Sequence, residues 1–338
     1  MKFLNSLLLG VIALAITSCV STPRDTLSPA FQSQSQTQSQ TQSIFKLRFQ
    51  NMLGLKLYYA GCSFQNLGGV ERMCQFAGEN PADLVFQVGP SFSELLGDPE
   101  TAKERESKRN ALWKIWKIQK VGFYSVDARD LAPSLTFFKN SHRGSSIALL
   151  SSNLLSKKGE FLFEPFLIKE FLGKKIVFLS FSEALEIHKE KSWKVESIEA
   201  SFKRIKNDIE SQADLFYILG SLSHNTRNQI SSLTLKPILF LGGALEENNS
   251  TSLEPLGSKD FLAKAASFGR GFSEIAIGKY ETNFWGKSPQ IILGGLDHSF
   301  WSYLLEPGDL KFNECSKALE TAKPQSLATE ALKLKVSP

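Results

Sequence analysis

The sequence predicts an α/β fold, in which helices cover the faces of a sheet of mainly parallel strands. Short apolar runs alternate along the chain with longer segments whose apolar residues follow the helical period. Several of the short runs end at glycine, as strands in such folds often do before a loop. The composition, with 42% hydrophobic residues and 26 phenylalanines among 338 residues, suits a body with a large apolar core.

The expected elements follow this alternation in chain order. Strands are predicted at residues 55–60, 83–88, 123–126, 146–150, 174–181, 214–219, 237–241 and 275–280. Helices are predicted at 100–121 and 195–212, with a helical turn at 134–139. Functional groups in α/β folds lie on loops at the strand ends, which here carry Gly61, Gly89, Asp127, Gly220 and Gly242.

The N-terminus has the pattern of an exported lipoprotein. A single positive charge at Lys2 precedes a mostly apolar run over residues 4–16, which is too short to span a bilayer. Small residues then lead to Cys19, and this arrangement resembles the lipobox of bacterial lipoproteins, in which the cysteine is acylated. A plain signal peptide with a chance cysteine is the alternative. Because Val20, and not Asp, follows the cysteine, the outer membrane is favoured over the inner membrane.

The domain organisation follows from composition. Residues 1–18 are expected to be the signal peptide, and residues 19–43, rich in Gln, Ser and Thr, a flexible linker behind the lipid. Residues 44–310 form the predicted body, and residues 311–338 a polar C-terminal tail. The formal charge of +5 over the whole chain is too small to indicate a nucleic-acid partner.

Four segments carry a resemblance to a known family. They read Gly-Cys-Ser-Phe-Gln-Asn-Leu-Gly-Gly-Val-Glu-Arg at 61–72, Val-Asp-Ala-Arg-Asp-Leu at 126–131, Ser-Ser-Asn-Leu at 151–154 and Ala-Ala-Ser-Phe-Gly-Arg-Gly at 265–271. In this order they resemble the calcineurin-like metallophosphoesterases, in their secreted 5′-nucleotidase branch. The resemblance implies a β-sandwich flanked by helices, with the layer order αββα.

The family's chemistry requires two metal ions that activate water and bind a phosphate, held by carboxylates and imidazoles. The expected ligand positions hold other residues here. Pro90 replaces an Asp, Ala128 and Arg129 replace an Asn-His pair, Ser221 replaces a His, and Ala244 and Glu246 replace two further histidines. The first expected strand, at 55–60, likewise lacks an Asp-x-His motif. We therefore predict no catalytic residue, no metal ligand and no cofactor.

Several other residues are weaker candidates for a site. Arg129, with Gly68, Gly69 and Gly243, is a possible remnant of an anion-binding pocket, although an ion pair of Arg129 with Asp127 or Asp130 and ordinary glycine turns are the alternatives. A rebuilt site around His224, Asp297 and His298 requires these three side chains to converge. Ordinary surface or hydrogen-bonded histidines are the alternative.

Three cysteines remain after Cys19. The exported compartment permits a disulfide between Cys62 and Cys74, with Cys315 left as an odd thiol; reduced, buried cysteines are the alternative.

The sequence thus predicts a membrane-anchored envelope lipoprotein whose phosphoesterase-like body lacks its metal centre. Such a body is expected to bind or scaffold an envelope protein or a small ligand. An active hydrolase with a rebuilt site and a two-lobed solute-binding lipoprotein are the alternatives.

Overall fold

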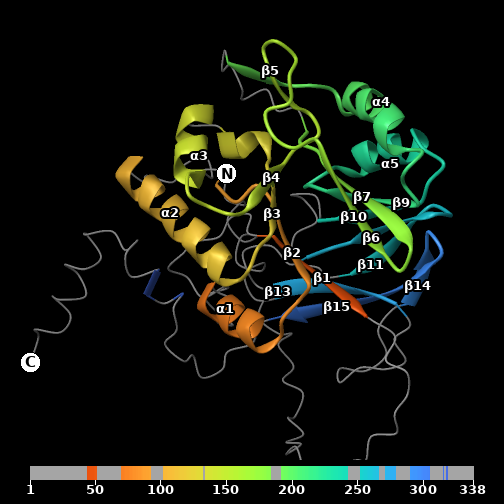
Figure 1. The fold of residues 1–338 in the computed structure, drawn as a ribbon, viewed down its shortest axis with the longest axis horizontal. Helices are drawn as coiled ribbons and strands as arrows, with labels where there is room; N and C mark the ends of the chain where they lie inside the picture. Colours follow the sequence, from red (N-terminus) through yellow and green to blue (C-terminus); the bar gives the residue numbers. More distant parts are fainter. Residues whose placement is uncertain are drawn as a thin grey trace, which may run out of the picture. The chain divides into compact units, whose positions relative to one another are not determined.

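Two β-sheets form the centre of the body (Figure 1). The computed structural model describes residues 44–51, 70–92, 102–131, 134–183, 192–242, 252–265, 271–278 and 290–304, together with 315, 317 and 318. Residues 42–338 belong to one compact unit. Among the described residues, none of the helices combines the length and apolar character that crossing a membrane requires.

The first sheet has seven strands in the order β14-β15-β13-β1-β2-β3-β4. Strands β1 to β4 are parallel, whereas β13, β15 and β14 continue the sheet in antiparallel pairing. Their bounds are β1 Phe45–Asn51, β2 Leu84–Val88, β3 Phe123–Ser125, β4 Ala148–Leu150, β13 Gly271–Ile277, β14 Gln290–Leu293 and β15 Leu296–Leu304.

The second sheet has six strands in the order β11-β12-β10-β9-β7-β6. Its four central strands are parallel, and the two edge strands pair in antiparallel fashion. The bounds are β6 Phe166–Phe171, β7 Lys174–Ser180, β9 Leu215–Leu219, β10 Ile238–Leu241, β11 Leu253–Leu256 and β12 Asp260–Ala263. A small third sheet pairs β5 Leu154–Ser156 with β8 Trp193–Val195.

The two large sheets pack face to face, and helices cover their outer faces (Figure 1). Side chains between the sheets include Phe86, Phe178 and Tyr217, all fully buried. On the outer face of the first sheet lie α1 Val70–Glu79, α2 Ala102–Ile118, the 3₁₀ turn Ala128–Leu131 and α3 Leu135–His142. On the second sheet lie α4 Ile198–Ile209 and α5 His224–Ser232. The predicted αββα layering is confirmed.

Local sequence explains why α4 forms where it does. The Ser197 side chain accepts a hydrogen bond from Ala200 N, which caps the helix start. The buried residues Ile198, Phe202, Ile205 and Ile209 follow the helical period and pack on the second sheet. This is the apolar stripe that the sequence predicts.

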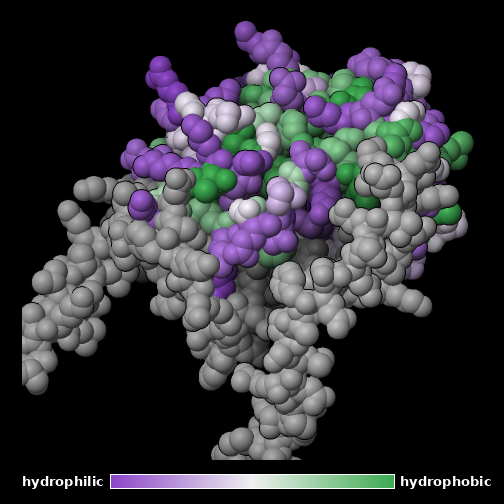
Figure 2. Space-filling model, turned by 60° about the horizontal axis from the view of Figure 1, so that its bottom comes forward, coloured by the Kyte–Doolittle hydropathy of each residue, from purple (hydrophilic) through white to green (hydrophobic). Residues whose placement is uncertain are grey.

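On the surface of the body, hydrophilic residues are interspersed with hydrophobic ones (Figure 2).

The first described strand of the body was not among the predicted strands. Strand β1 spans Phe45–Asn51, whereas the predicted strand at 55–60 lies outside the described residues. Phe45, Leu47 and Phe49 alternate toward the second sheet, while Arg48 and Gln50 point the other way and are also buried. Strand β1 is buried on both faces, yet apolar and polar residues alternate along it. A strand buried on both faces is usually recognised by a continuous apolar run, which β1 lacks.

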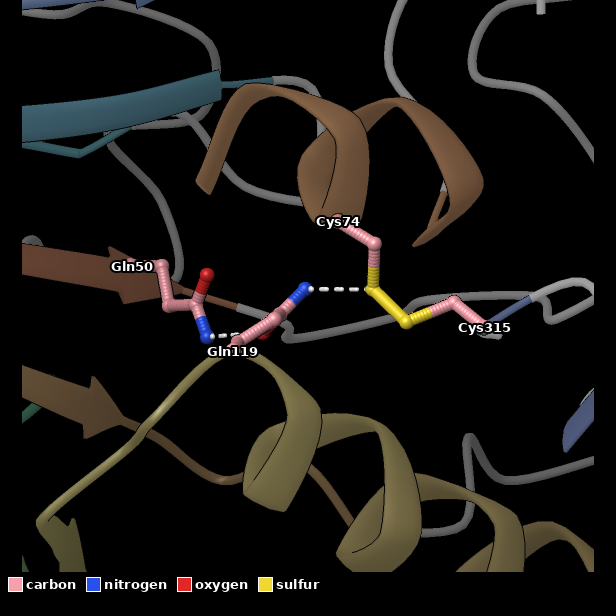
Figure 3. The surroundings of a disulfide bond; sticks show 4 residues. All are labelled: Gln50, Cys74, Gln119 and Cys315. Carbon is pink, nitrogen blue, oxygen red and sulfur yellow. Dashed lines mark hydrogen bonds between the residues drawn. A yellow bond between two sulfur atoms is a disulfide. The ribbon is translucent and has the colours of Figure 1, made fainter. Parts of the chain in front are cut away.

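The disulfide prediction is wrong. Cys74 on α1 is bonded to Cys315, which is fully buried in the core below the first sheet's helices (Figure 3). Gln119 Nε2 donates to Cys74 Sγ at 3.4 Å, and Gln50 Nε2 donates to Gln119 Oε1 at 3.0 Å. Cys62 lies outside the described residues. The bond joins positions 241 residues apart, a pairing that sequence spacing does not suggest. The segment predicted as a polar tail therefore places Cys315 in the core.

Candidate functional site at the strand ends

The carboxyl ends of the parallel strands lie along one edge of the sandwich, as the predicted fold requires. In the first sheet the backbone register aligns Asn51, Val88, Ser125 and Leu150 as successive strand ends. In the second sheet it aligns Ser180, Leu219, Leu241 and Ala263. We call this edge, with the loops that follow these residues, the carboxyl edge. Ligands of open α/β sheets bind at such an edge.

The two rows of strand ends approach each other closely. Ser125 Oγ of the first sheet lies 2.6 Å from Ser180 Oγ of the second. A β-carbon added to Gly242 lies 3.3 Å from Val88 Cγ1 and 2.6 Å from the carbonyl oxygen of Gly220. Gly220 and Gly242 have φ values of +147° and +131°, which suit glycine. At Gly220 and Gly242 the neighbouring backbone therefore lies so close that a side chain has no room.

A hydroxyl and amide network links the ends of β4 and β7. Asn153 Oδ1 accepts from Ser182 N at 3.0 Å, and its Nδ2 donates to the Ser182 carbonyl at 2.7 Å. Ser182 Oγ accepts from Ala128 N at 2.9 Å. Since Ser152, Asn153 and Ser182 are fully buried, their polar groups are committed to holding the loops together.

Asp130 is the centre of a second network. Its Oδ1 accepts from the amides of Ser91 and Phe92 at 3.0 and 2.8 Å. Its Oδ2 accepts from Tyr124 Oη at 2.6 Å and from Asp127 N at 3.0 Å. Burial and the nearby charge of Asp127 raise the pKa of Asp130 to about 6, although the hydrogen bonds it accepts oppose this shift. The carboxylate thus ties the loop after β2 to the loop after β3.

Arg129 forms an ion pair with its neighbour in this loop. Its Nε and Nη2 donate to the two oxygens of Asp127 at 2.6 and 3.0 Å, so that the predicted alternative of an ion pair is confirmed. Burial opposes the charge of Arg129, but the hydrogen bonds and charge of Asp127 raise its pKa overall, and Asp130 and Glu183 add to the effect. This bidentate pair puts a fixed cation at the end of β3.

The described residues of the carboxyl edge do not fit a pair of metal ions. Asp127 is engaged by Arg129, and both Asp130 oxygens are used by hydrogen bonds. Glu183 accepts from Ser223 N at 2.6 Å. Within the described part of the chain, no three His, Cys, Asp or Glu side chains are placed to hold a metal. The charge of the Asp127 carboxylate, which could otherwise attract a metal ion, is compensated by the Arg129 guanidinium.

The positions that replace the expected ligands are mostly buried. Pro90 and Ala128 are buried beside their strand ends. Ser221 is buried too, and its hydroxyl has no hydrogen-bond partner among the described residues. Ala244, Glu246 and the anion-site candidates Gly68, Gly69 and Gly243 lie outside the described residues, as do Cys19 and Cys62.

The structure does not bring His224, Asp297 and His298 together. His224 begins α5, just after the carboxyl end of β9, and its ring bonds to Asn228. His298 pairs with Ile277, which in turn pairs with Phe45, the first residue of β1. Asp297 and His298 therefore lie at the opposite end of the parallel strands, so the alternative of a rebuilt site around these three residues is wrong.

His298 has a different role. Its Nε2 lies 2.6 Å from Tyr217 Oη of the second sheet, and its Nδ1 lies 2.9 Å from the Leu296 carbonyl. Burial lowers its pKa to about 4, against the opposing effects of the Leu296 carbonyl and the Asp297 charge. The neutral ring joins the two sheets from within the apolar layer.

Sequence reasoning missed the roles of Asp130, Tyr124 and Asn153. Asp130 was expected only as an alternative partner for Arg129. The available signal was an acid placed three residues after Asp127 in a loop that follows an apolar strand, a spacing at which a carboxylate can accept backbone amides. The partners on the loop after β2 are 38 and 39 residues away and have no local signal.

Comparisons with known proteins place this geometry in a fold group. No family model matches the sequence, and no curated protein matches it. Several solved structures, however, are similar to this chain in fold. A 5′-nucleotidase precursor from Thermus thermophilus superposes with a TM-score of 0.59 at 12% identity, over 86% of this chain and 60% of that one. The calcineurin-like phosphoesterase YfkN from Bacillus subtilis gives 0.57 at 13% identity, over 86% and 99%.

This chain has the calcineurin-like phosphoesterase fold. The NAD nucleotidase of Haemophilus influenzae supports the same conclusion, with a TM-score of 0.53 at 13% identity over 82% of this chain and 55% of that chain. The chain studied here thus spans less than two thirds of the two nucleotidases but almost the whole of the Bacillus phosphoesterase structure. At these identities the similarity concerns the fold alone.

Proposed function

We propose that this chain is a lipid-anchored protein of the bacterial cell envelope that uses a calcineurin-like phosphoesterase fold to bind or scaffold, without two-metal catalysis. Acylation of Cys19 would hold it to the membrane, with the outer membrane favoured and the body on its periplasmic or surface side. The Gln-, Ser- and Thr-rich segment over 19–43 would be its tether.

One observation supports the proposed absence of two-metal catalysis. The loop after β3 holds Arg129 in a bidentate pair with Asp127, and Asp130 accepts four hydrogen bonds that fasten two loops of the carboxyl edge. Charges and lone pairs that a metal centre needs are thereby engaged in protein contacts. A binding role for the same edge is consistent with this rigid arrangement.

The two alternatives receive less support. The hydrolase with a rebuilt site needed His224 near His298, and these residues lie at opposite ends of the strands. A solute-binding protein of two lobes needs a division of the body, whereas residues 42–338 belong to one compact unit.

The catalytic part of the proposal is tested with the full chain and with Arg129→Ala. Nucleoside monophosphates and a phenyl phosphate ester are offered with Mn²⁺ or Zn²⁺, and phosphate release is measured. We expect no metal-dependent release above the buffer control for either protein. Release that depends on the metal and changes with Arg129→Ala, but not with the exposed Lys203→Ala, contradicts the proposal, because a contaminating enzyme is indifferent to Arg129.

The anchor is tested separately in cells. Metabolic labelling with a radioactive fatty acid should mark the wild-type chain and not Cys19→Ser, and only the wild type should fractionate with membranes. A labelled Cys19→Ser chain, or an unlabelled wild type in the soluble fraction, contradicts the anchor without touching the catalytic argument.

A further inference from the structure

The turn between β6 and β7 carries an exposed leucine in an unfavourable conformation. Leu172 has φ of +50° and is 54% exposed, and Gly173 follows with φ of +73°. Two successive residues with positive φ form the tight hairpin turn in which asparagine or glycine normally stands first. Because more than half of its surface is exposed, the Leu172 side chain gains little from the fold to offset this conformation, which suggests that it serves a contact outside the body.

The hairpin tip lies beside the start of the described body. Phe171, beside Leu172, contacts Phe45 at the start of β1, with ring centroids 4.0 Å apart. Phe45 is the second described residue, so the described body begins at this point. Figure 1 shows the β6–β7 turn beside β14. Consistently, a β-carbon added to Gly295 in the β14–β15 turn lies 3.6 Å from Lys174 Cε.

Two further exposed apolar side chains belong to the same end of the strands. Ile292, on edge strand β14, is 75% exposed, and Leu235, in the loop before β10, is 93% exposed. The Leu235 loop is joined to the hairpin side of the sheet, because Pro237 accepts from Phe216 N on β9 and Asp214, before β9, accepts from Lys175 N. Leu172, Leu235 and Ile292 are the exposed large hydrophobic residues of the described body.

The charges around these three residues are of both signs, with a small positive excess. They include six lysines and five acids: Lys46, Lys169, Lys174, Lys175, Lys236 and Lys259 with Asp83, Glu170, Asp214, Asp260 and Asp297. Asp214 is paired with Lys174 at 3.2 Å. We call these lysines with Leu172, Leu235 and Ile292 the amino edge.

We propose that the amino edge rests on the headgroup layer of an anionic bilayer. The inference rests on the proposed lipid anchor, and the described body begins at this edge. Scattered apolar side chains can enter the boundary between headgroups and acyl chains, and lysines around them attract lipid phosphates. The carboxyl edge, with its Arg129 loop, then faces away from the membrane.

The experiment uses the acylated full chain in vesicles of phosphatidylethanolamine and phosphatidylglycerol. In a Cys62→Ser background, a fluorophore is attached through Leu172→Cys, Ile292→Cys or, on exposed α5 at the carboxyl edge, Asn225→Cys. Lipids with nitroxide headgroups then quench the fluorescence. We expect quenching at 172 and 292 to exceed that at 225 by about threefold or more, since an interfacial segment sits within about 5–10 Å of that boundary.

Charge-reversal variants test the contribution of the lysines. Lys174→Glu combined with Lys175→Glu should lower the quenching at position 292, whereas Lys203→Glu on exposed α4 should leave it unchanged. Near-ultraviolet circular dichroism of each labelled protein checks that it is folded. If position 172 is not tolerated, position 292 gives the same comparison.

The outcomes separate the two proposals. A chain that fails to float with the vesicles overturns both the anchor and the docked amino edge. A chain that floats but shows equal quenching at 172, 292 and 225 overturns the docked edge alone, and leaves a protein partner as the occupant of these apolar residues.

Discussion

Asp130 shows at the scale of one residue how the carboxyl edge is held. Four donors converge on its carboxylate, three of them backbone amides from the loops after β2 and β3. A buried amide that loses its acceptor costs about 1–3 kcal/mol. The side chain is therefore a structural acceptor at the carboxyl edge, and its contribution to stability is measurable.

We expect Asp130→Asn to lower the free energy of unfolding by about 2–4 kcal/mol, because the new NH₂ group faces donors and leaves at least one amide unpaired. Urea unfolding followed by circular dichroism measures this loss. The exposed Asp208→Asn is the matched change and should cost less than about 0.5 kcal/mol. Equal small effects for both variants would contradict the acceptor role.

At the scale of elements, close backbone contact between the ends of β7, β9 and β10 explains two of the strand-end glycines in the sequence pattern. A β-carbon at Gly220 lies 2.5 Å from the Phe181 carbonyl oxygen, nearer than any real β-carbon approaches an oxygen. Gly257 also has positive φ, +71°, but has open space around it. Comparing substitutions at Gly220 and Gly257 therefore separates the destabilisation caused by a steric clash from that caused by the positive φ alone.

Gly220→Ala should therefore destabilise the protein by about 3 kcal/mol or more, and Gly257→Ala by only about 1 kcal/mol. Thermal and urea unfolding of the two variants give the comparison. Similar losses would mean that backbone conformation, and not the approach of β9 to the end of β7, sets the requirement for glycine.

The disulfide is an element-scale constraint as well, since it fastens a C-terminal segment to α1. Cys315→Ser should lower the free energy of unfolding by about 2–5 kcal/mol, as loss of a native disulfide typically does. Cys62→Ser should leave the bond between Cys74 and Cys315 intact. Peptide mapping without reductant should yield a crosslinked peptide containing Cys74 and Cys315, and a Cys62–Cys74 peptide in its place would contradict the structure.

Elements with an apolar run or a clear helical stripe could be predicted from the sequence. Strands β2, β7, β9 and β10 and helices α2 and α4 fall within one to three residues of their predicted bounds. The antiparallel edges were missed. Strand β6 is only half-buried and β14 mostly exposed, so neither shows the apolar run of a central strand.

The carboxyl edge was predictable in outline because strand ends are local features, and the glycines mark them. Its contacts were not. Asn153 to Ser182 and Asp130 to Phe92 join loops from different strands, and such pairings depend on the packing of the two sheets. The disulfide of Cys315 was not predicted for the same reason, since its partner Cys74 is 241 residues away in the sequence.

At the scale of the whole molecule, two buried titratable groups act on stability in opposite directions. Asp130 has a folded-state pKa raised from 3.8 to about 6, so its contribution is full below 3.8 and is lost as pH rises through 6. His298 has a pKa lowered from 6.5 to about 4, so its contribution is present above 6.5 and is lost as pH falls through 4. The two windows overlap.

Because each group changes the free energy of unfolding by up to about 1.4 kcal/mol per pH unit, their slopes largely cancel between pH 4 and 6 in the wild type. Asp130→Asn should expose the His298 term, so that the variant loses more stability than the wild type as pH falls from about 6.5 to about 4.5. His298→Gln, whose amide can still reach Tyr217, should expose the Asp130 term and lose less. Urea unfolding of the three proteins at about pH 4.5, 5.5 and 6.5 measures this, with the other titrating groups common to all. Parallel profiles would mean that folding shifts the pKa of neither Asp130 nor His298, which would contradict the burial of these two groups.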